Sequence, residues 1–365
     1  MTKKEIGRAV AFALVVCLML VLLCDLFELE NSSNYDKRFY TYRNFNDDTI
    51  DAVWIGTSGA DRYWIPSKAY EEYGMTVYPL VSDAMPTWLL VNMIEEAYTY
   101  QNPELIIIDT RAFGQTNPRA RRMENRSRRV LDAMQYLSPN WFKATFKTTT
   151  TIHKAFNNKQ VLDASYLLPF IKYHSKWEED DYTLESNLGG KIHSYAGFFM
   201  NSQLSVQQAE TAPVPVRYNA NVYIDLDPVS EESLYELLEY ITANNINVLF
   251  VDTPQYKTLL EMGRANTVYR ILDEYDIDYI NLCQTDKEGN FYLNADLDPA
   301  TDFYDEGHVN YYGAEKFTAM FAAYLDENYD LPDRRDDESV KEYWDGIYKK
   351  TKRAIARWEN DATEE

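Results

Sequence analysis

The sequence has few cysteines and comparatively little positive charge. Its three cysteines, Cys17, Cys24 and Cys283, cannot build a disulfide framework, and the first two lie in an apolar run, which excludes a cysteine-rich zinc site. Lys and Arg number 36 against 58 Asp and Glu, so the formal net charge is −22. That charge excludes a nucleic-acid-binding protein, because such a protein needs a basic surface to contact phosphates.

Histidine is scarce as well, with four residues in the chain. Three of them, His153, His174 and His193, lack the spacing of metal ligands, so we expect no metal and no cofactor, although His193 could line a cleft. With 45% hydrophobic and 26% charged residues, the 365-residue chain has the composition of a globular protein and is not disordered.

Only one apolar run is long enough to cross a membrane. Every residue from 9 to 24 is apolar, and the run extends over residues 6–27, about the 20 residues that a helix needs to span the hydrocarbon layer. Basic residues precede it and acidic residues follow it: Lys3, Lys4 and Arg8, then Asp25, Glu28 and Glu30. The positive-inside rule predicts a single-pass cell-membrane protein with its N-terminus inside and its bulk extracytoplasmic. The alternative is a signal peptide, but no small-x-small cleavage site precedes Asp25.

Beyond this run, short apolar segments alternate with amphipathic ones. The predicted strands are 49–56, 75–81, 104–110, 246–254 and 278–283. The predicted helices are 66–73, 88–101, 230–245, 257–275 and 313–328. This alternation predicts a doubly wound α/β domain with a mostly parallel sheet covered on both faces. Functional residues are then expected at the carboxyl ends of the strands.

The predicted domain organisation follows from these segments. Residues 1–29 form a cytoplasmic stub and the anchor, 30–48 a linker, and 49–330 the α/β domain, while 331–365 form an acidic linker and an amphipathic C-terminal helix. That helix packs on the domain, on a partner or on the membrane surface. Residues 112–225 have weak periodicity and are too long for a βα connection. We expect them to form an inserted cap at the carboxyl edge of the sheet; the alternative is a peripheral insertion.

Within the insertion, six arginines fall in eleven positions: Arg119, Arg121, Arg122, Arg126, Arg128 and Arg129. Such a run is usually a solvated helix face paired with acidic neighbours. The alternative is a cradle for phosphate groups of an anionic polymer or of lipid headgroups, because guanidinium groups match phosphate oxygens bidentately.

A serine directly follows the first predicted strand, in the turn Gly56-Thr57-Ser58-Gly59. Its hydroxyl lies at the carboxyl edge of the sheet and its N–H at a helix start, where backbone amides favour a developing negative charge. This placement suits a nucleophile, although Gly-x-Ser turns and helix-capping serines are common.

A second motif, D-F-Y-D-E-G-H-V-N, precedes the last helix of the α/β domain and places Asp305 and His308 three residues apart in a loop. A serine nucleophile needs a base to take its proton, and the base needs a carboxylate to fix its tautomer. This loop contains both groups. The alternative for His308 alone is a structural histidine.

Together, the two motifs resemble the SGNH (GDSL-like) hydrolase superfamily, over about residues 50–328 without the insertion. The resemblance implies a three-layer α/β/α fold in which Ser58 is the nucleophile, His308 the base and Asp305 its orienting carboxylate. The trailing Asn310 also fits the family pattern and is counted as a candidate binding residue.

Two blocks depart from the family pattern. The residues after the second predicted strand, Val81-Ser82-Asp83-Ala84, include no glycine, and the third predicted strand ends in Asp109-Thr110-Arg111 in place of G-x-N-D. We therefore expect the oxyanion hole to combine the Ser58 amide with a donor from Ser82 or Arg111.

These departures resemble a membrane-anchored branch of the superfamily that includes the D-alanyl transfer proteins of teichoic acid and the acetylation proteins of alginate and cellulose. The resemblance implies a serine esterase or O-acyltransferase beside a multi-pass membrane O-acyltransferase, acting on an anionic glycan or teichoic-acid-like polymer. Thirty Tyr and seven Trp are compatible with sugar binding. The alternative is a non-catalytic glycan-binding or scaffolding protein that kept the fold.

Overall fold

The structure is a computed structural model of the chain. The described residues are 1–28, 34–114, 120–156, 163–178, 193–200, 221–284 and 296–364.

A five-stranded, all-parallel sheet forms the centre of the molecule. Its strands are β1 (Ala52–Gly56), β2 (Val77–Val81), β3 (Leu105–Asp109), β4 (Val248–Asp252) and β5 (Tyr279–Asn281). Their order is β2-β1-β3-β4-β5. All five segments that the sequence predicted as strands are strands, and the predicted parallel arrangement is confirmed. The chain order reverses between β1 and β3, and in sheets of this kind the crevice outside the strand ends at such a point is the usual ligand site.

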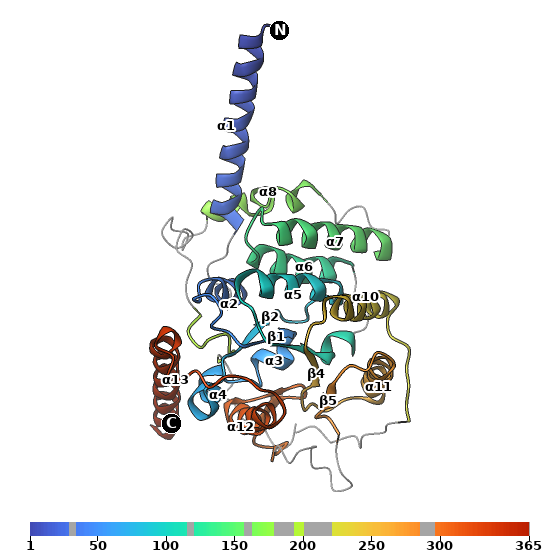
Figure 1. Ribbon diagram of the computed structural model, residues 1–365, viewed down its shortest axis with the longest axis vertical. Coiled ribbons are helices and arrows are strands. Elements are labelled where there is room, and N and C mark those ends of the chain that lie inside the picture. Colours follow the sequence, from blue (N-terminus) through green and yellow to red (C-terminus); the bar gives the residue numbers. More distant parts are fainter. Residues whose placement is uncertain are drawn as a thin grey trace.

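Helices cover both faces of the sheet, because alternate strand residues point to opposite sides. Val53 and Ile55 belong to one apolar cluster, and Ala52 and Trp54 to the other. The first cluster includes residues of α2 (Asn34–Arg43), α5 (Leu90–Tyr100), α10 (Pro228–Asn244) and α11 (Leu259–Glu274). The second includes residues of α3 (Ser58–Asp61), α4 (Pro66–Tyr73) and α12 (Tyr311–Asn328). In Figure 1, α5 and α10 lie above the sheet and α4 and α12 below it.

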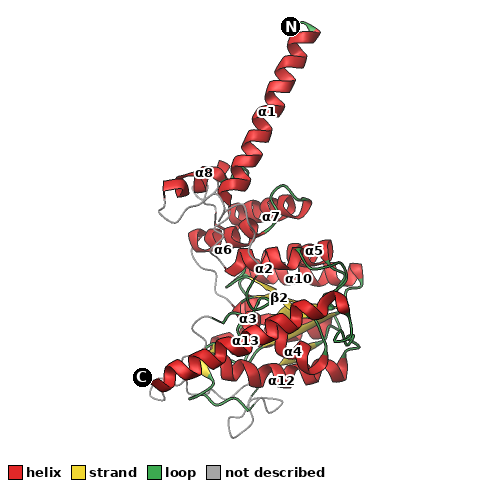
Figure 2. Cartoon of the chain, turned by 90° about the vertical axis from the view of Figure 1, so that its left-hand side faces the viewer, coloured by secondary structure: helices red, strands yellow, loops and turns green. Residues whose placement is uncertain are grey.

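The N-terminal helix α1 (Lys3–Glu28) projects away from this body (Figures 1 and 2). Residues 3–24 are long and apolar enough to span a membrane, and their side chains are mostly exposed. At its base α1 contacts the short helix α8 (Phe170–Tyr173).

The segment predicted as the linker 30–48 contains helix α2, which packs in the domain. Phe39 and Tyr42 are buried in the first apolar cluster. Arg38 is fully buried, and its guanidinium donates to the carbonyl oxygens of Val81 (2.9 Å) and Gly197 (2.8 Å). The α/β domain therefore begins before residue 49. The polar composition of residues 34–44 hid this, because the buried charge is satisfied only by distant partners.

Where a cap was expected, the described residues of the insertion form a series of helices. They are η2 (Thr110–Gly114), α6 (Ala120–Ala133), α7 (Pro139–Phe156), η3 (Ala164–Tyr166), α8 and η4 (His174–Glu178). Helices α6 and α7 pack on each other and on α2 and α5, so they form an outer layer on the side of α1 (Figures 1 and 2). Trp141 of α7 is buried in the first apolar cluster, and the Asn140 amide donates to Glu96 of α5 (3.1 Å), so both apolar and polar contacts hold this layer to the domain.

The C-terminal helix α13 (Glu338–Glu364) packs on the domain, against α4. Trp344 is fully buried and stacks on Tyr70 of α4, with ring centroids 5.6 Å apart. The preceding segment is also docked, because Arg334 pairs with the buried Asp51 (2.6 Å). The domain was one of the three surfaces on which this helix was expected to pack, and it is the one that α13 contacts.

Candidate active site

The turn that carries Ser58 is built around a buried aspartate at the end of β3. The Asp109 carboxylate accepts a hydrogen bond from the Thr57 N–H (3.2 Å) and another from the Thr57 hydroxyl. Gly56 has a φ of 149°, and a Cβ there would lie 2.4 Å from the Cβ of Asp109. Glycine is therefore required where β1 passes β3. Burial raises the pKa of Asp109.

His308 and Asp305 lie on a short antiparallel hairpin, where the sequence had suggested a loop. Strand β6 (Phe303–Asp305) pairs with β7 (His308–Val309), and the Gly307 N–H between them donates to the Asp305 carboxylate (2.8 Å). This turn sets both side chains on the same side of the hairpin.

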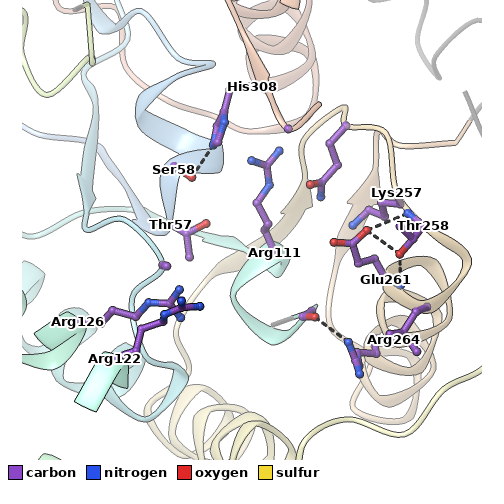
Figure 3. Close-up of a pocket in the computed structure, with 15 residues that line it drawn as sticks. Thr57, Ser58, Arg111, Arg122, Arg126, Lys257, Thr258, Glu261, Arg264 and His308 are labelled. Carbon is purple, nitrogen blue, oxygen red and sulfur yellow. Dashed lines mark hydrogen bonds between the residues drawn. The ribbon is translucent and has the colours of Figure 1, made fainter. Parts of the chain in front are cut away.

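Ser58, His308 and Asp305 form one chain of hydrogen bonds. Ser58 Oγ lies 2.8 Å from His308 Nε2, and His308 Nδ1 lies 2.9 Å from each Asp305 oxygen (Figure 3 shows the first contact). An ionised carboxylate only accepts hydrogen bonds, so Nδ1 carries the proton and Nε2 accepts from the serine hydroxyl. Ser58 and His308 are 250 residues apart in the sequence, and the fold brings them to a distance suited to proton transfer.

The electrostatics keep the histidine neutral. Burial lowers the pKa of His308, and the Arg111 guanidinium lowers it further, against the opposing effect of Asp305. Burial acts to raise the pKa of Asp305, but the hydrogen bonds from His308 and Gly307 outweigh it and the net shift is downward. At neutral pH a neutral imidazole therefore faces an ionised carboxylate. The Tyr304 ring stacks on the imidazole, with centroids 5.6 Å apart.

A cavity of about 500 Å³ opens beside Ser58 at the carboxyl edge of the sheet. Thr57, Ser58, Gly307 and His308 line one part of it, and Lys257, Glu261 and Arg264 line another (Figure 3). Ser58 and His308 thus lie where the switch in strand order predicts a ligand site.

Of the three further candidates, the structure brings only Arg111 into this cavity. Arg111 donates to the Thr253 hydroxyl (3.2 Å). Ser82 is fully buried and does not line the cavity; its N–H donates to the Gly56 carbonyl (3.3 Å). Asn310 is also fully buried and caps α12, accepting from the Gly313 N–H (3.1 Å). Ser82 and Asn310 therefore hold the backbone around the site.

The arginine cluster divides into two parts. Arg122 and Arg126 line the cavity, whereas Arg128 is buried and donates to the Ser165 carbonyl (2.8 Å) and to Glu124 (3.2 Å). Arg119 lies outside the described residues, and Arg121 is described only as part of α6. One part of the cluster is thus structural and another belongs to the site.

Sequence reasoning missed a second buried network, close to Ser58 in the chain. Asp61, three residues after Ser58, pairs with Arg38 (2.7 Å) and with Arg62 (3.1 Å), and Arg62 also pairs with Asp83 (2.7 Å). The signal in the sequence for this network was Asp61, which lies in the first helical turn after Ser58. Its partners could not be found, because they come from other elements.

His193 is buried and does not line the cavity; its Nδ1 accepts from the Gly197 N–H (3.0 Å). Within the described part of the chain, no three His, Cys, Asp or Glu side chains are grouped as a metal site. No protein-family model matches the chain, and no curated protein matches its sequence.

Proposed function

We propose that the protein is a membrane-anchored, extracytoplasmic serine esterase or O-acyltransferase of the SGNH type. It acts on acyl groups of a cell-envelope glycan or teichoic-acid-like polymer. The hydrogen-bonded series Ser58, His308 and Asp305 at the edge of a 500 Å³ cavity carries the proposal.

In the first step, His308 Nε2 takes the proton of the Ser58 hydroxyl as Oγ attacks the acyl carbonyl carbon. The tetrahedral intermediate collapses, and the imidazolium gives that proton to the departing alcohol oxygen, which leaves an acyl ester on Ser58. In the second step, water or a polymer hydroxyl gives its proton to His308 and attacks the acyl carbon. The proton then returns to Oγ, so the free serine is restored.

The negative charge on the intermediate needs donors. The Ser58 amide begins helix α3, where backbone N–H groups have no acceptor within the helix. Arg111 lines the same cavity and is the second donor that we propose, because Ser82 is buried away from it.

The anchor α1 and the charges beside it support an extracytoplasmic site next to the bilayer. We propose a multi-pass membrane O-acyltransferase as the protein partner that passes the acyl group to Ser58. The Ser82 side chain, which is buried and does not line the cavity, favours one alternative, a non-catalytic glycan-binding or scaffolding role.

A fluorophosphonate probe separates these two functions. The full chain in detergent should be labelled, Ser58→Ala should abolish labelling, and Ser175→Ala, at an exposed serine of η4, should not. In cells, Ser58→Ala should remove acyl groups from the envelope. If the folded chain is not labelled and the envelope keeps its acyl groups in Ser58→Ala cells, the scaffolding role is correct.

A further inference from the structure

The cavity beside Ser58 is strongly cationic in a protein that is strongly anionic overall. Five cationic residues line it: Arg111, Arg122, Arg126, Lys257 and Arg264. The acidic residue in its lining, Glu261, is engaged in a capping box, where its carboxylate accepts from the Thr258 N–H and hydroxyl (2.8 Å each). A formal net charge of −22 makes this concentration of positive charge a local feature of the site.

Two of these cations are held by partners behind the cavity wall. Lys257 pairs with the buried Asp252 (2.7 Å), and Arg111 donates to Thr253 and lies over the Tyr63 ring, 5.5 Å from its centroid. On the far wall, Arg264 donates to the Gly114 carbonyl at 3.4 Å, which leaves its charge without compensation from that contact.

Arg122 and Arg126 are one helical turn apart on α6, so their side chains share a face. Figure 3 shows their guanidinium groups next to each other beside Thr57. Like charges at this spacing destabilise a helix. Burial lowers the pKa of Arg126, and the charges of Arg122 and Arg129 lower it further. Arg122 and Arg126 thus bring two like charges to one cavity, an arrangement that suits an anion.

Arg128, on the same helix, has a structural role and serves as a comparison for Arg122. Its guanidinium lies 3.5 Å from the centroid of the Tyr166 ring and donates to Glu124 and Ser165, so its charge is compensated within the fold. In the described residues, Arg122 has no acidic partner of this kind and faces the cavity.

We propose that Arg122 and Arg126 bind an oxyanion of the substrate, a phosphodiester or a carboxylate, next to the ester that Ser58 attacks. This inference rests on the proposed function and adds a recognition element to it. The planar guanidinium groups suit bidentate binding of either anion. The site therefore selects acyl esters that carry a negative charge close to the acylated oxygen.

The first test measures anion binding in the Ser58→Ala background, so that it does not depend on catalysis. The full chain in detergent is titrated at constant ionic strength with inorganic phosphate and, separately, with acetate. Arg122→Gln and Arg126→Gln should each weaken binding of the preferred anion about tenfold. Arg129→Gln, on the same helix but outside the cavity lining, should change it less than about twofold.

Tighter binding of phosphate than of acetate would indicate a phosphodiester substrate, and the reverse would indicate a carboxylate substrate. Arg122→Lys keeps the charge but not the fork, and should restore only part of the affinity. Equal losses in the Arg129→Gln control would show a general field effect and overturn the proposal, as would unchanged affinity in the Gln variants.

The second test compares kcat/KM for a phosphate-bearing or carboxylate-bearing ester with kcat/KM for a neutral ester of the same acyl group. The ratio should exceed ten in the natural chain and fall about tenfold in the Arg122→Gln and Arg126→Gln variants. If Ser58-dependent activity is present but the ratio is near one, the anion site is refuted while the esterase stands. If neither ester reacts, the proposed function fails and the binding test alone decides the anion site.

Discussion

The turn that carries Ser58 and the hairpin that carries its base are held in different ways. The turn rests on buried polar groups: Asp109 is fully buried, Asp61 almost fully, and Arg38, which pairs with Asp61, is fully buried. On the hairpin, the Asp305 side chain is 48% exposed and the His308 side chain 22%. Ser58 is thus held by the core, whereas the His308 side chain is held mainly by Asp305 and Tyr304 of its own hairpin. Substitutions in the two regions should therefore separate stability from activity.

The largest effect is expected on activity, at the catalytic groups themselves. Ser58→Ala and His308→Ala should each lower ester turnover by about 10³-fold or more, and the double variant should lose no more than either single one, because the groups act as a unit. The midpoint of urea unfolding should shift little. A double variant far less active than both single variants would contradict the assigned roles.

Asp305→Asn should cost less, about 10²-fold in kcat, because the half-exposed carboxylate orients and stabilises the imidazolium but does not react. Steady-state kinetics of the purified chain measures it. A loss as large as that of His308→Ala would show that the carboxylate does more than orient the ring.

Substitutions that disturb the buried groups around the Ser58 turn should lower the free energy of unfolding. Arg38→Met leaves the buried Asp61 carboxylate without its 2.7 Å partner and should lower the free energy of unfolding by about 3–5 kcal/mol. Urea unfolding of the full chain in detergent, followed by tryptophan fluorescence, measures this loss. Lys154→Met, which breaks an exposed pair with Glu232, is the control and should cost no more than about 1 kcal/mol. Equal losses would remove the contrast between the two regions.

The smallest effect is a shift in pH dependence. In the proposed mechanism the neutral form of His308 is the base, so activity should rise with pH through its pKa. The lowered pKa places half-maximal kcat/KM below pH 6.5. Because Arg111 lowers this pKa, Arg111→Gln should move the midpoint upward, whatever it does to the maximal rate. A midpoint that stays in place would show that Arg111 does not act on the imidazole.

The sequence predicted the sheet well because its strands are buried on both faces and read as short apolar runs between helices. It also singled out Ser58, Asp305 and His308, because each motif carries its chemistry within a few residues, and the structure brings the three side chains within hydrogen-bonding distance. The supports of the site were harder to find. Arg38 lies in a polar stretch, and Asp109 looked like a departure from a motif, although it holds the nucleophile turn.

Ser82 and Asn310 show the opposite error. Both are polar residues next to functional motifs, and local sequence does not tell a side chain that faces a cavity from one that caps a helix or lies beneath a strand end. In the sequence, Arg122 and Arg126 look the same as Arg128. Only the position of α6 beside the cavity distinguishes the arginines that line it from the buried one. That placement depends on packing between α6, α2 and α7, which no local pattern encodes.

The most direct test of Ser58 as the nucleophile is to trap the acyl-enzyme. The full chain in detergent, mixed with an activated acetyl ester and quenched in acid, should gain the mass of one acetyl group on the peptide that contains Ser58. The gain should be absent in Ser58→Ala and strongly reduced in His308→Ala. A folded, Ser58-intact chain that acquires no acetyl group, or acquires it on another residue, would contradict the assignment of Ser58 as the nucleophile.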